Sequence, residues 1–407
     1  MSPKHKLPPL FSEFQPLPKQ EWERLVRVII DEPNLHKLNW QYQDELELPP
    51  YFTSEETKEF RYIKALDFKP PKHKIGARWL RKWLFLEEVT IEDEHKANVQ
   101  ALHALENGAE GVVFEIINDN EINWRNLLQN IKPEHCNLSF VVNTGRQECG
   151  QQYLNYLNDA GIDLIKVNGH FLLPFSNHPS ELLEPQLKHF ELFKNAVGIR
   201  SIDIDLKALQ KEDFEIIKQT ALALSYLVEL VDGLTARGVE ASQVFSRIQL
   251  TISLGNEFFM EMAKLRALRF LISQIAKEYP GTSYDPEGIN LHCISHLHTN
   301  SNDEATNILS NTLQALAAIL GGCNSISLAP HDSRNQQYNQ WSARIARNIS
   351  LILREEVHLD KFMDPAAGSY YLESITHKLV KGSWNLFLKI EEDGGYTKFK
   401  ENEYSLN

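Results

Sequence analysis

Three histidines lie close together in the stretch LHCISHLHTN, Leu291–Asn300. On an extended strand His292, His296 and His298 face the same side, because successive side chains alternate between the two faces. Imidazoles, with Cys293 beside them, are ligands that zinc and other divalent metals use. Barrel enzymes, however, gather metal ligands from several strands, and no second predicted strand carries a His-x-His pair. The stretch therefore fits ordinary polar lining better than a metal site.

A pair of carboxylates, Asp203 and Asp205, lies on one face of the predicted strand SIDIDL. Two carboxylates in one site can act as general acid and general base. An unpaired buried carboxylate is costly, so this arrangement requires a partner group or a hydrated lumen. The pair alone does not predict a reaction.

Three other stretches contain reactive residue types, and each has a simpler structural interpretation. DEHKAN, Asp93–Asn98, differs in its last residue from the Asp-x-His-x-x-Gly string whose histidine ligates cobalt, and acidic residues also favour a helix start. Tyr370 and Tyr371 offer phenols, but such pairs usually pack at the boundary of an element. GRQECGQQ, Gly145–Gln152, follows a predicted strand but lacks the glycines and the Gly-Lys-Ser/Thr of a phosphate loop.

The elements that position these residues alternate between short β-branched runs and longer helical patterns, which is typical of parallel βαβ units. The helical spacing is clear in Asn256–Tyr279. Seven strands and an eighth near Phe362–Asp364 fit a (β/α)8 barrel better than an open sheet. The seven predicted strands are Val112–Ile117, Leu138–Thr144, Asp163–Gly169, Ser201–Leu206, Arg247–Ser253, Ile289–Leu297 and Ser325–Leu328.

Composition limits the class of protein. The chain has 407 residues, 42% of them hydrophobic, and a formal net charge of -13. A surface this acidic disfavours nucleic acids. The four cysteines form no Cys-x-x-Cys pair, and the sequence shows no apolar secretion signal and no membrane span. We therefore expect a cytoplasmic protein, with an N-terminal arm over residues 1–75 and a barrel over 76–407.

The string DPAAGSYYLESIT, Asp364–Thr376, resembles a signature of the methylmalonyl-CoA mutase family, D-P-x-x-G-S-Y-Y-x-E-x-x-T. Three further segments resemble that family in the same order along the chain: FFMEMAKLRALR, Phe258–Arg269; NTLQALAAILGG, Asn311–Gly322; and WSARIARNISLILREE, Trp341–Glu356. The resemblance covers roughly residues 80–400. The arm, with LFSEFQPLPKQEW and LPPYF, resembles the arm of the family's small subunits.

This resemblance implies a (β/α)8 barrel through which a CoA ester threads. It also implies a radical rearrangement that interconverts methylmalonyl-CoA and succinyl-CoA with adenosylcobalamin. In the family, cobalamin is held by a separate C-terminal domain. This chain ends at Asn407 and contains no Asp-x-His-x-x-Gly string. We therefore expect no C-terminal cobalamin-binding domain, and no cofactor bound by this chain alone.

The residues of the lumen depart from the family's catalytic pattern. In RWLRKWLF, Arg81 keeps an arginine of the family's W-T-I-R-Q-Y-A-G, but Trp83 replaces its tyrosine. The family's Tyr-His pair falls on Asp203 and Ile204, so the histidine that hydrogen-bonds the thioester carbonyl is absent. Loss of such a donor typically costs roughly 10²–10³ in rate. The resemblance therefore predicts no catalytic residue in this chain.

Some substrate-binding positions are retained. The family's R-L-S becomes Arg247, Ile248 and Gln249, which keeps the arginine and a polar group. With Arg81, the resemblance predicts Arg247 and Gln249 as substrate-binding residues and leaves weak acyl-CoA binding open. No metal ligand is predicted.

A chain that keeps the family's packing residues and loses its lumen groups resembles the non-catalytic small subunit of a heterodimeric mutase. The resemblance then implies a cobalamin-binding large subunit as partner, across a pseudo-twofold interface that the arm extends. Two alternatives stay open. One is the active acyl-CoA-binding barrel of a split cobalamin-dependent mutase, and the other is a metal hydrolase that uses His292, His296 and His298.

Overall fold

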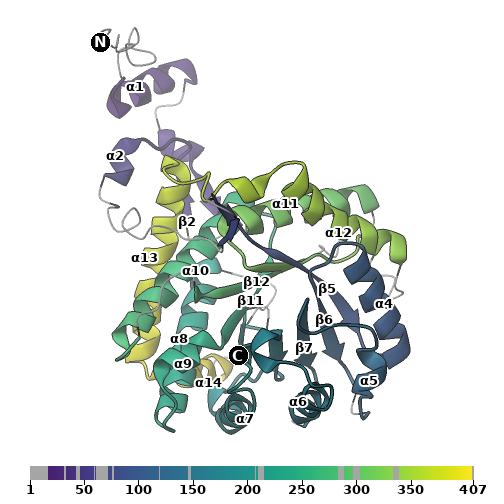
Figure 1. The fold of residues 1–407 in the computed structure, drawn as a ribbon. Helices are drawn as coiled ribbons and strands as arrows, with labels where there is room; N and C mark the ends of the chain where they lie inside the picture. Colours follow the sequence, from purple (N-terminus) through teal and green to yellow (C-terminus); the bar gives the residue numbers. More distant parts are fainter. Residues whose placement is uncertain are drawn as a thin grey trace, which may run out of the picture.

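Nine parallel strands form a nearly closed barrel in the computed structural model (Figure 1). The strands are β5 Leu84–Thr90, β6 Gly111–Ile116, β7 Asn137–Val142, β8 Asn168–Leu172, β9 Gly198–Arg200, β10 Ile202–Asp205, β11 Ile248–Leu254, β12 Asn290–Ser295 and β13 Ser325–Ser327. β13 pairs with β5 and so joins the first strand of the barrel to the last. Only Ser201 separates β9, which pairs with β8, from β10, which pairs with β11, so these two share the fifth strand position. The predicted (β/α)8 barrel is confirmed.

The structure describes most of the chain but not every residue. The described residues are 17–31, 34–42, 46–58, 60, 72–75, 78–118, 120–144, 148–206, 208–209, 215–282, 288–296, 303–332 and 339–405. Within these residues no helix is both long enough and apolar enough to span a bilayer.

One of the eight predicted strands is absent, one is displaced, and the first strand of the barrel is not among those predicted. The barrel begins with β5, LFLEEVT, whose two adjacent glutamates interrupt the apolar pattern; Glu87 faces outward and pairs with Arg347 of α12. Phe362–Asp364 forms no strand, because Phe362 only ends the 3-10 turn η5, Leu359–Lys361. The strand predicted at Asp163–Gly169 is displaced along the chain, since Leu164–Lys166 is the 3-10 turn η2 and β8 follows it.

Helices surround the barrel and bury its outer face. They are α4 Glu94–Glu106, α5 Trp124–Leu127, α6 Cys149–Asp159, α7 Pro179–Leu192, α8 Ile216–Thr235, α9 Ala241–Ser246, α10 Phe258–Glu278, α11 Glu304–Gly321, α12 Gln340–Glu355, α13 Tyr370–Glu392 and α14 Gly395–Ser405. α13 packs outside α8 and α10, which explains why those two helices are buried on nearly every side.

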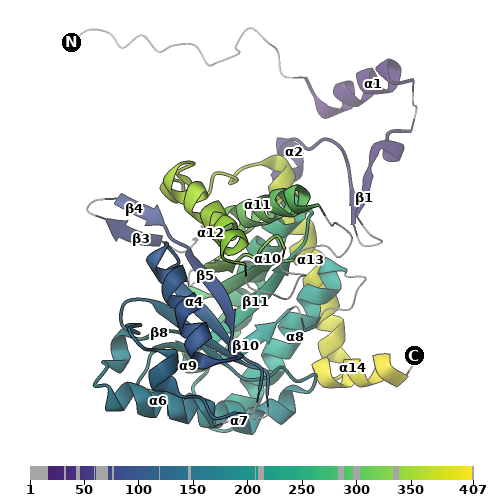
Figure 2. The same ribbon diagram turned by 90° about the vertical axis from the view of Figure 1, so that its right-hand side faces the viewer.

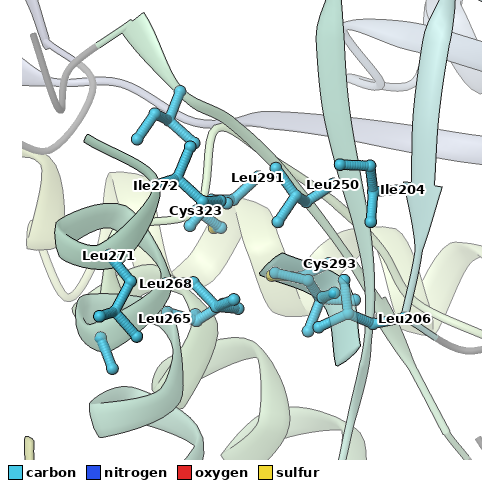
Figure 3. Packing of buried hydrophobic residues seen from close by; sticks show 14 of the residues in the cluster. Ile204, Leu206, Leu250, Leu265, Leu268, Leu271, Ile272, Leu291, Cys293 and Cys323 are labelled. Atoms are coloured by element: carbon cyan, nitrogen blue, oxygen red, sulfur yellow. The ribbon is translucent and has the colours of Figure 1, made fainter. Parts of the chain in front are cut away.

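The apolar interior forms two clusters on the outside of the sheet. The larger lies between β10–β13 and the helices α8, α10 and α13, and the smaller lies behind β6–β8. In the larger cluster Ile204, Leu206 and Leu250 pack near Leu265 and Leu268 of α10 (Figure 3). These alternate strand residues point outward, so their polar neighbours in the sequence point into the lumen.

The N-terminal region before the barrel consists of short elements. They are α1 Lys19–Ile29, the 3-10 turn η1 Leu35–Leu38, the hairpin of β1 Trp40–Tyr42 and β2 Leu46–Leu48, α2 Ser54–Thr57, and the hairpin of β3 Lys72–Ile75 and β4 Arg78–Arg81. α1 stands away from the barrel and has no buried residue (Figure 2). The division into an arm at 1–75 and a barrel at 76–407 stays a prediction.

Candidate functional site

A cavity of about 880 Å³ opens at the N-terminal ends of the barrel strands. Its wall comes from the first residues of several strands and the loops that precede them. Five carboxamides belong to this wall: Asn137, Asn168, Gln249, Asn290 and Asn324. The charged and ring-bearing lining residues are Arg81, Lys82, Trp83, Glu110, Glu134, His135, His170, Arg200, Arg354, Glu355 and Asp360.

Arg81, at the end of β4, lies in the wall of this cavity with only 1% of its surface exposed. None of the residues that the structure describes accepts a hydrogen bond from its Nε, Nη1 or Nη2. Burial lowers the pKa of Arg81 to about 10, which still leaves the guanidinium charged at neutral pH. The guanidinium is thus enclosed by protein beside the cavity, and Asp364 and Cys323 lie near enough to interact with it electrostatically.

Trp83 is buried between the cavity and α12, and its Nε1 donates to Oγ of Ser350 at 3.0 Å. Gln249, at the start of β11, accepts a hydrogen bond from Nδ2 of Asn290 at 2.8 Å. Arg81 and Gln249, two of the three predicted substrate-binding residues, thus line the same cavity.

Arg247, the third predicted substrate-binding residue, does not line this cavity. Its guanidinium donates to the backbone carbonyls of Phe193, Lys194, Ala196 and Ile199 at 2.6–3.3 Å. These bonds tie the end of α7 and the start of β9 to β11. The geometry gives Arg247 a structural role.

Two histidines face each other in the lumen at the inner end of the cavity. The rings of His170 on β8 and His292 on β12 have centroids 5.7 Å apart, and both are buried. Nδ1 of His292 lies 2.9 Å from Oγ of Ser325, whereas Nε2 of His170 has no hydrogen-bond partner among the described residues. Burial lowers the pKa of both, that of His292 to about 4, so both imidazoles are neutral at pH 7.

Sequence reasoning missed His170. The strand was predicted to end at Gly169, which left the next residue outside the barrel. A signal was available, because His170 and Leu172 continue the alternation of the strand that Asn168 begins.

The fifth strand position offers carboxylates to the lumen and no imidazole. Asp203 accepts a hydrogen bond from Oγ1 of Thr251 at 2.9 Å, and burial together with the charge of Asp205 raises its pKa well above the usual range. Ile204 is fully buried in the larger outer cluster (Figure 3). No residue of β10 therefore offers an imidazole to the lumen.

The histidines of LHCISHLHTN do not act as a set in the described structure. His292 faces the lumen, Cys293 is buried in the outer cluster, and the backbone nitrogen of His296 donates to Gln314. His298 lies outside the described residues. Within the described part of the chain, no group of three His, Cys, Asp or Glu side chains could hold a metal ion.

The remaining stretches have structural roles. Asp93 caps α4 by accepting a hydrogen bond from the Lys96 nitrogen, and Cys149 begins α6, while residues 145–147 lie outside the described part. Tyr371 packs edge-to-face against Phe52 and Phe259, each with ring centroids 5.4 Å away, which supports packing as its role. Tyr370 is half exposed.

The DPAAGSYY turn connects the barrel to its outer helix. Asp364 and Glu373 both accept hydrogen bonds from Arg266 of α10, at 2.6 and 3.0 Å. Gly368 adopts a φ of 82°, and Ser369 caps α13. The turn thus docks α13 on α10 through a buried ion-pair cluster.

Comparisons with known proteins agree with these features. A family model described as methylmalonyl-CoA mutase matches residues 175–405. The methylmalonyl-CoA mutase small subunit of Porphyromonas gingivalis (strain ATCC BAA-308 / W83) is 28% identical over 407 residues, covering 96% of this chain and 66% of that relative. The small subunit of Propionibacterium freudenreichii subsp. shermanii is 30% identical over 215 residues, 52% of this chain and 34% of the relative.

A methylmalonyl-CoA mutase of Rhizobium meliloti (strain 1021) is 34% identical over 206 residues, which is 50% of this chain and 29% of the relative. The chain thus spans less than two thirds of the length of these relatives. The family match nevertheless includes more than half of the chain, from the end of β8 through α14. From its barrel, its DPAAGSYY turn and this match, the chain belongs to the methylmalonyl-CoA mutase family.

Proposed function

We propose that this chain is the non-catalytic small subunit of a heterodimeric, adenosylcobalamin-dependent methylmalonyl-CoA mutase in the cytoplasm. The complex would interconvert methylmalonyl-CoA and succinyl-CoA, and the large subunit would carry the chemistry. The observation that carries the proposal is the fifth strand position, where Ile204 is buried outside the barrel and only carboxylates face the lumen. The names of the relatives, which include small and large subunits from one organism, support a two-chain assembly.

The described residues do not fit cobalamin. The stretch most similar to the cobalt-binding string is Asp93–Asn98, and its histidine, His95, lies in the first turn of α4. Asp93 caps this helix by accepting a hydrogen bond from the backbone nitrogen of Lys96. The last residue of that string, Asn98, is buried and donates to the carbonyls of Leu127 and Gln129. We therefore assign the cofactor to the partner chain and derive no chemical step from it here.

The surface of α1 supports an interface with that partner. Leu25, Val28 and Ile29 lie on one side of this helix, at the i, i+3 and i+4 spacing, and are 37%, 71% and 78% exposed. Trp22, on the same helix, stacks on Tyr51 with ring centroids 4.3 Å apart. An apolar helix face that covers no part of its own barrel is typical of a segment that buries against another protein.

The test is co-purification of the tagged chain from its native extract, followed by mass spectrometry and cobalamin analysis. We expect one partner in equal amount, larger than this chain and containing cobalamin. The double variant Val28→Ser, Ile29→Ser should reduce its recovery by at least tenfold. The matched control Val99→Ser, Ile165→Ser changes two exposed apolar residues elsewhere, 53% and 70% exposed, and should not alter recovery.

One observation favours a second candidate, the active acyl-CoA-binding barrel of a split mutase. Arg81 and Gln249, both predicted substrate-binding residues, line one cavity at the mouth of the lumen. A short partner consisting only of a cobalamin-binding domain would support this candidate and contradict the non-catalytic proposal. Recovery of no stoichiometric partner would contradict both.

A further inference from the structure

Helix α11 has no charged residue after its first position. Its residues 305–321 read ATNILSNTLQALAAILG, in a chain of which 24% is charged. Leu309 and Leu313 are 65% and 52% exposed, and half-buried Leu316 extends the same stripe along the helix. Because a helix that faces water normally carries charged and polar side chains on its outer side, this composition is unusual for a helix left in contact with solvent.

The neighbouring helix α12 extends this apolar surface. Trp341 and Ile352 are 58% and 48% exposed, and half-buried Ile345 lies between them. The Trp341 ring packs edge-to-face against His331, with centroids 5.4 Å apart, and the carbonyl of His331 accepts a hydrogen bond from Nδ2 of Asn307 on α11 at 2.9 Å. This contact holds Trp341 beside the first turns of α11, which itself packs along α12. The two helices share one surface, here called the α11–α12 face, made of Leu309, Leu313, Leu316, Trp341, Ile345 and Ile352.

The opposite side of the barrel has a different character. Within the part of the chain that the structure describes, no helix from α5 to α9 exposes a large apolar side chain. α7, for example, presents Glu181, Glu184, Lys188 and Glu191 to the solvent. An apolar surface confined to one side of a barrel is typical of a contact with another protein.

The position of the arm indicates which protein this is. In both views α1 and α2 lie above the side of the barrel that α11 and α12 form (Figure 1, Figure 2). A protein as large as a barrel subunit that rests on the α11–α12 face would therefore also reach the exposed apolar side of α1. A lipid surface fits less well, because helices that lie on membranes carry lysine and arginine on their polar side, and α11 has neither.

The size of the face agrees with a shared interface. Helices of 18 and 16 residues are about 27 and 24 Å long, and side by side they present roughly 500 Å². Stable complexes bury about 800 Å² on each partner. The α11–α12 face alone is too small for such a complex, and the 11 residues of α1 bring the total close to this size.

We propose that the α11–α12 face is the surface on which the barrel of the partner mutase subunit rests, with α1 as an arm against the same partner. This inference depends on the proposed two-chain assembly and adds the side of this barrel that the partner covers. Trp341 is the expected anchor, since large aromatic side chains within an interface often carry much of the binding energy.

Co-purification of the tagged full chain from its native extract tests the face, measured as recovery of the larger, cobalamin-containing chain. The double variant Leu309→Glu, Leu313→Lys places a Glu–Lys pair at i, i+4, which is favourable within a helix and unfavourable inside an apolar contact. We expect recovery to fall at least tenfold while the melting temperature of the isolated chain stays the same. Trp341→Ala, on the neighbouring helix, should also lower recovery at least tenfold.

The matched control places the same charged pair on α6, which lies on the opposite side of the barrel (Figure 1). Gln151 and Asn155 are exposed and joined by a hydrogen bond of 2.9 Å, so Gln151→Glu, Asn155→Lys should leave recovery unchanged. An equal loss in this control would overturn the inference, because the pair would then act without touching the α11–α12 face.

The outcomes separate this inference from the proposed function. If the partner is recovered equally with the unchanged chain, the α11 variant and Trp341→Ala, the proposed face is wrong and the two-chain assembly stands. If the unchanged chain recovers no partner, both are wrong. Sedimentation of the isolated chain gives a further check, since a dimer that the α11 variant converts to a monomer would assign the face to a second copy and overturn the inference.

Discussion

At the scale of single residues, the lumen contains two histidines, His170 and His292, whose burial disfavours their protonated, charged form. His170 and His292 lie ring to ring with little exposed surface, and protonation of either would place a cation in a desolvated site. Burial is the main cause of the lowered pKa of both, and at His170 the charges of His292 and Arg200 lower the pKa further. This pair therefore couples the stability of the barrel to pH.

The free energy of unfolding should decrease in mild acid for this reason. The unfolded chain protonates His292 near pH 6.5, while the folded chain keeps it neutral to about pH 4. As the pH falls through this window the unfolded state takes up the proton first, so stability present above pH 6.5 is lost. The loss from His292 is on the order of 3 kcal/mol. His170, shifted in the same direction, adds to it.

Urea unfolding between pH 4.5 and 7.5 measures this dependence. His292→Gln should flatten it, and the control His95→Gln changes an exposed histidine and should not. A slope that is the same in His292→Gln and in the unchanged chain would show that other groups cause the acid sensitivity.

Aromatic residues of the family-like segments differ in what they stabilise. If buried, both Trp341 and Tyr371 would cost roughly 3–5 kcal/mol on truncation to alanine. Trp341 is 58% exposed and has the His331 ring 5.4 Å from its own, whereas Tyr371 packs against Phe52 and Phe259. We therefore expect Trp341→Ala to cost under about 1 kcal/mol and Tyr371→Ala about 2 kcal/mol. Equal losses in urea unfolding would contradict this ranking.

At the scale of elements, the DPAAGSYY turn explains why a loop has such a specific sequence. Its aspartate and the glutamate of the next turn converge on Arg266, and its glycine and serine set the start of α13. α13 then covers α8 and α10, which would otherwise expose apolar surface. The turn therefore determines the folding and docking of the outer layer.

Gly368 provides a clean test of this turn. A Cβ added there meets no atom within 4 Å, so Gly368→Ala changes only the backbone preference at a φ of 82°. Left-handed backbone costs a non-glycine residue roughly 1–2 kcal/mol. Urea unfolding should show a loss of about that size for Gly368→Ala and a smaller loss for Gly368→Asn, because asparagine tolerates this conformation. A neutral alanine variant would mean that the turn relaxes.

At the scale of the whole molecule, the chain combines a well-packed barrel with an open cavity at its N-terminal mouth and an exposed apolar face on α1. The outer face of the sheet is buried in two apolar clusters. The N-terminal mouth of the barrel opens into a cavity of about 880 Å³, and α1 presents apolar residues that no described part of the chain covers. The apolar face of α1 is the feature that supports an interface with another protein.

The sequence by itself determined the class of fold, the order of most strands and the family. β-branched runs and helical spacing repeat along the chain, and the signature segments occupy α10–α13, where local packing constrains many neighbouring residues at once. The resemblance to the family also predicted Arg81 and Gln249 as substrate-binding residues, which stays a prediction. Sequence reasoning failed for β5, where Glu87 pairs with Arg347, a residue far away in the sequence.

Only the tertiary structure decided which polar residues share a site. Arg247 and Gln249 are two residues apart in the sequence. Arg247 donates its hydrogen bonds to backbone carbonyls, whereas Gln249 lines the cavity. His170 and His292 are 122 positions apart and become neighbours because strand closure brings β8 and β12 to opposite sides of one lumen. That Arg81 has no hydrogen-bond acceptor among the described residues follows from the tertiary structure alone, because it depends on where every surrounding acceptor atom lies.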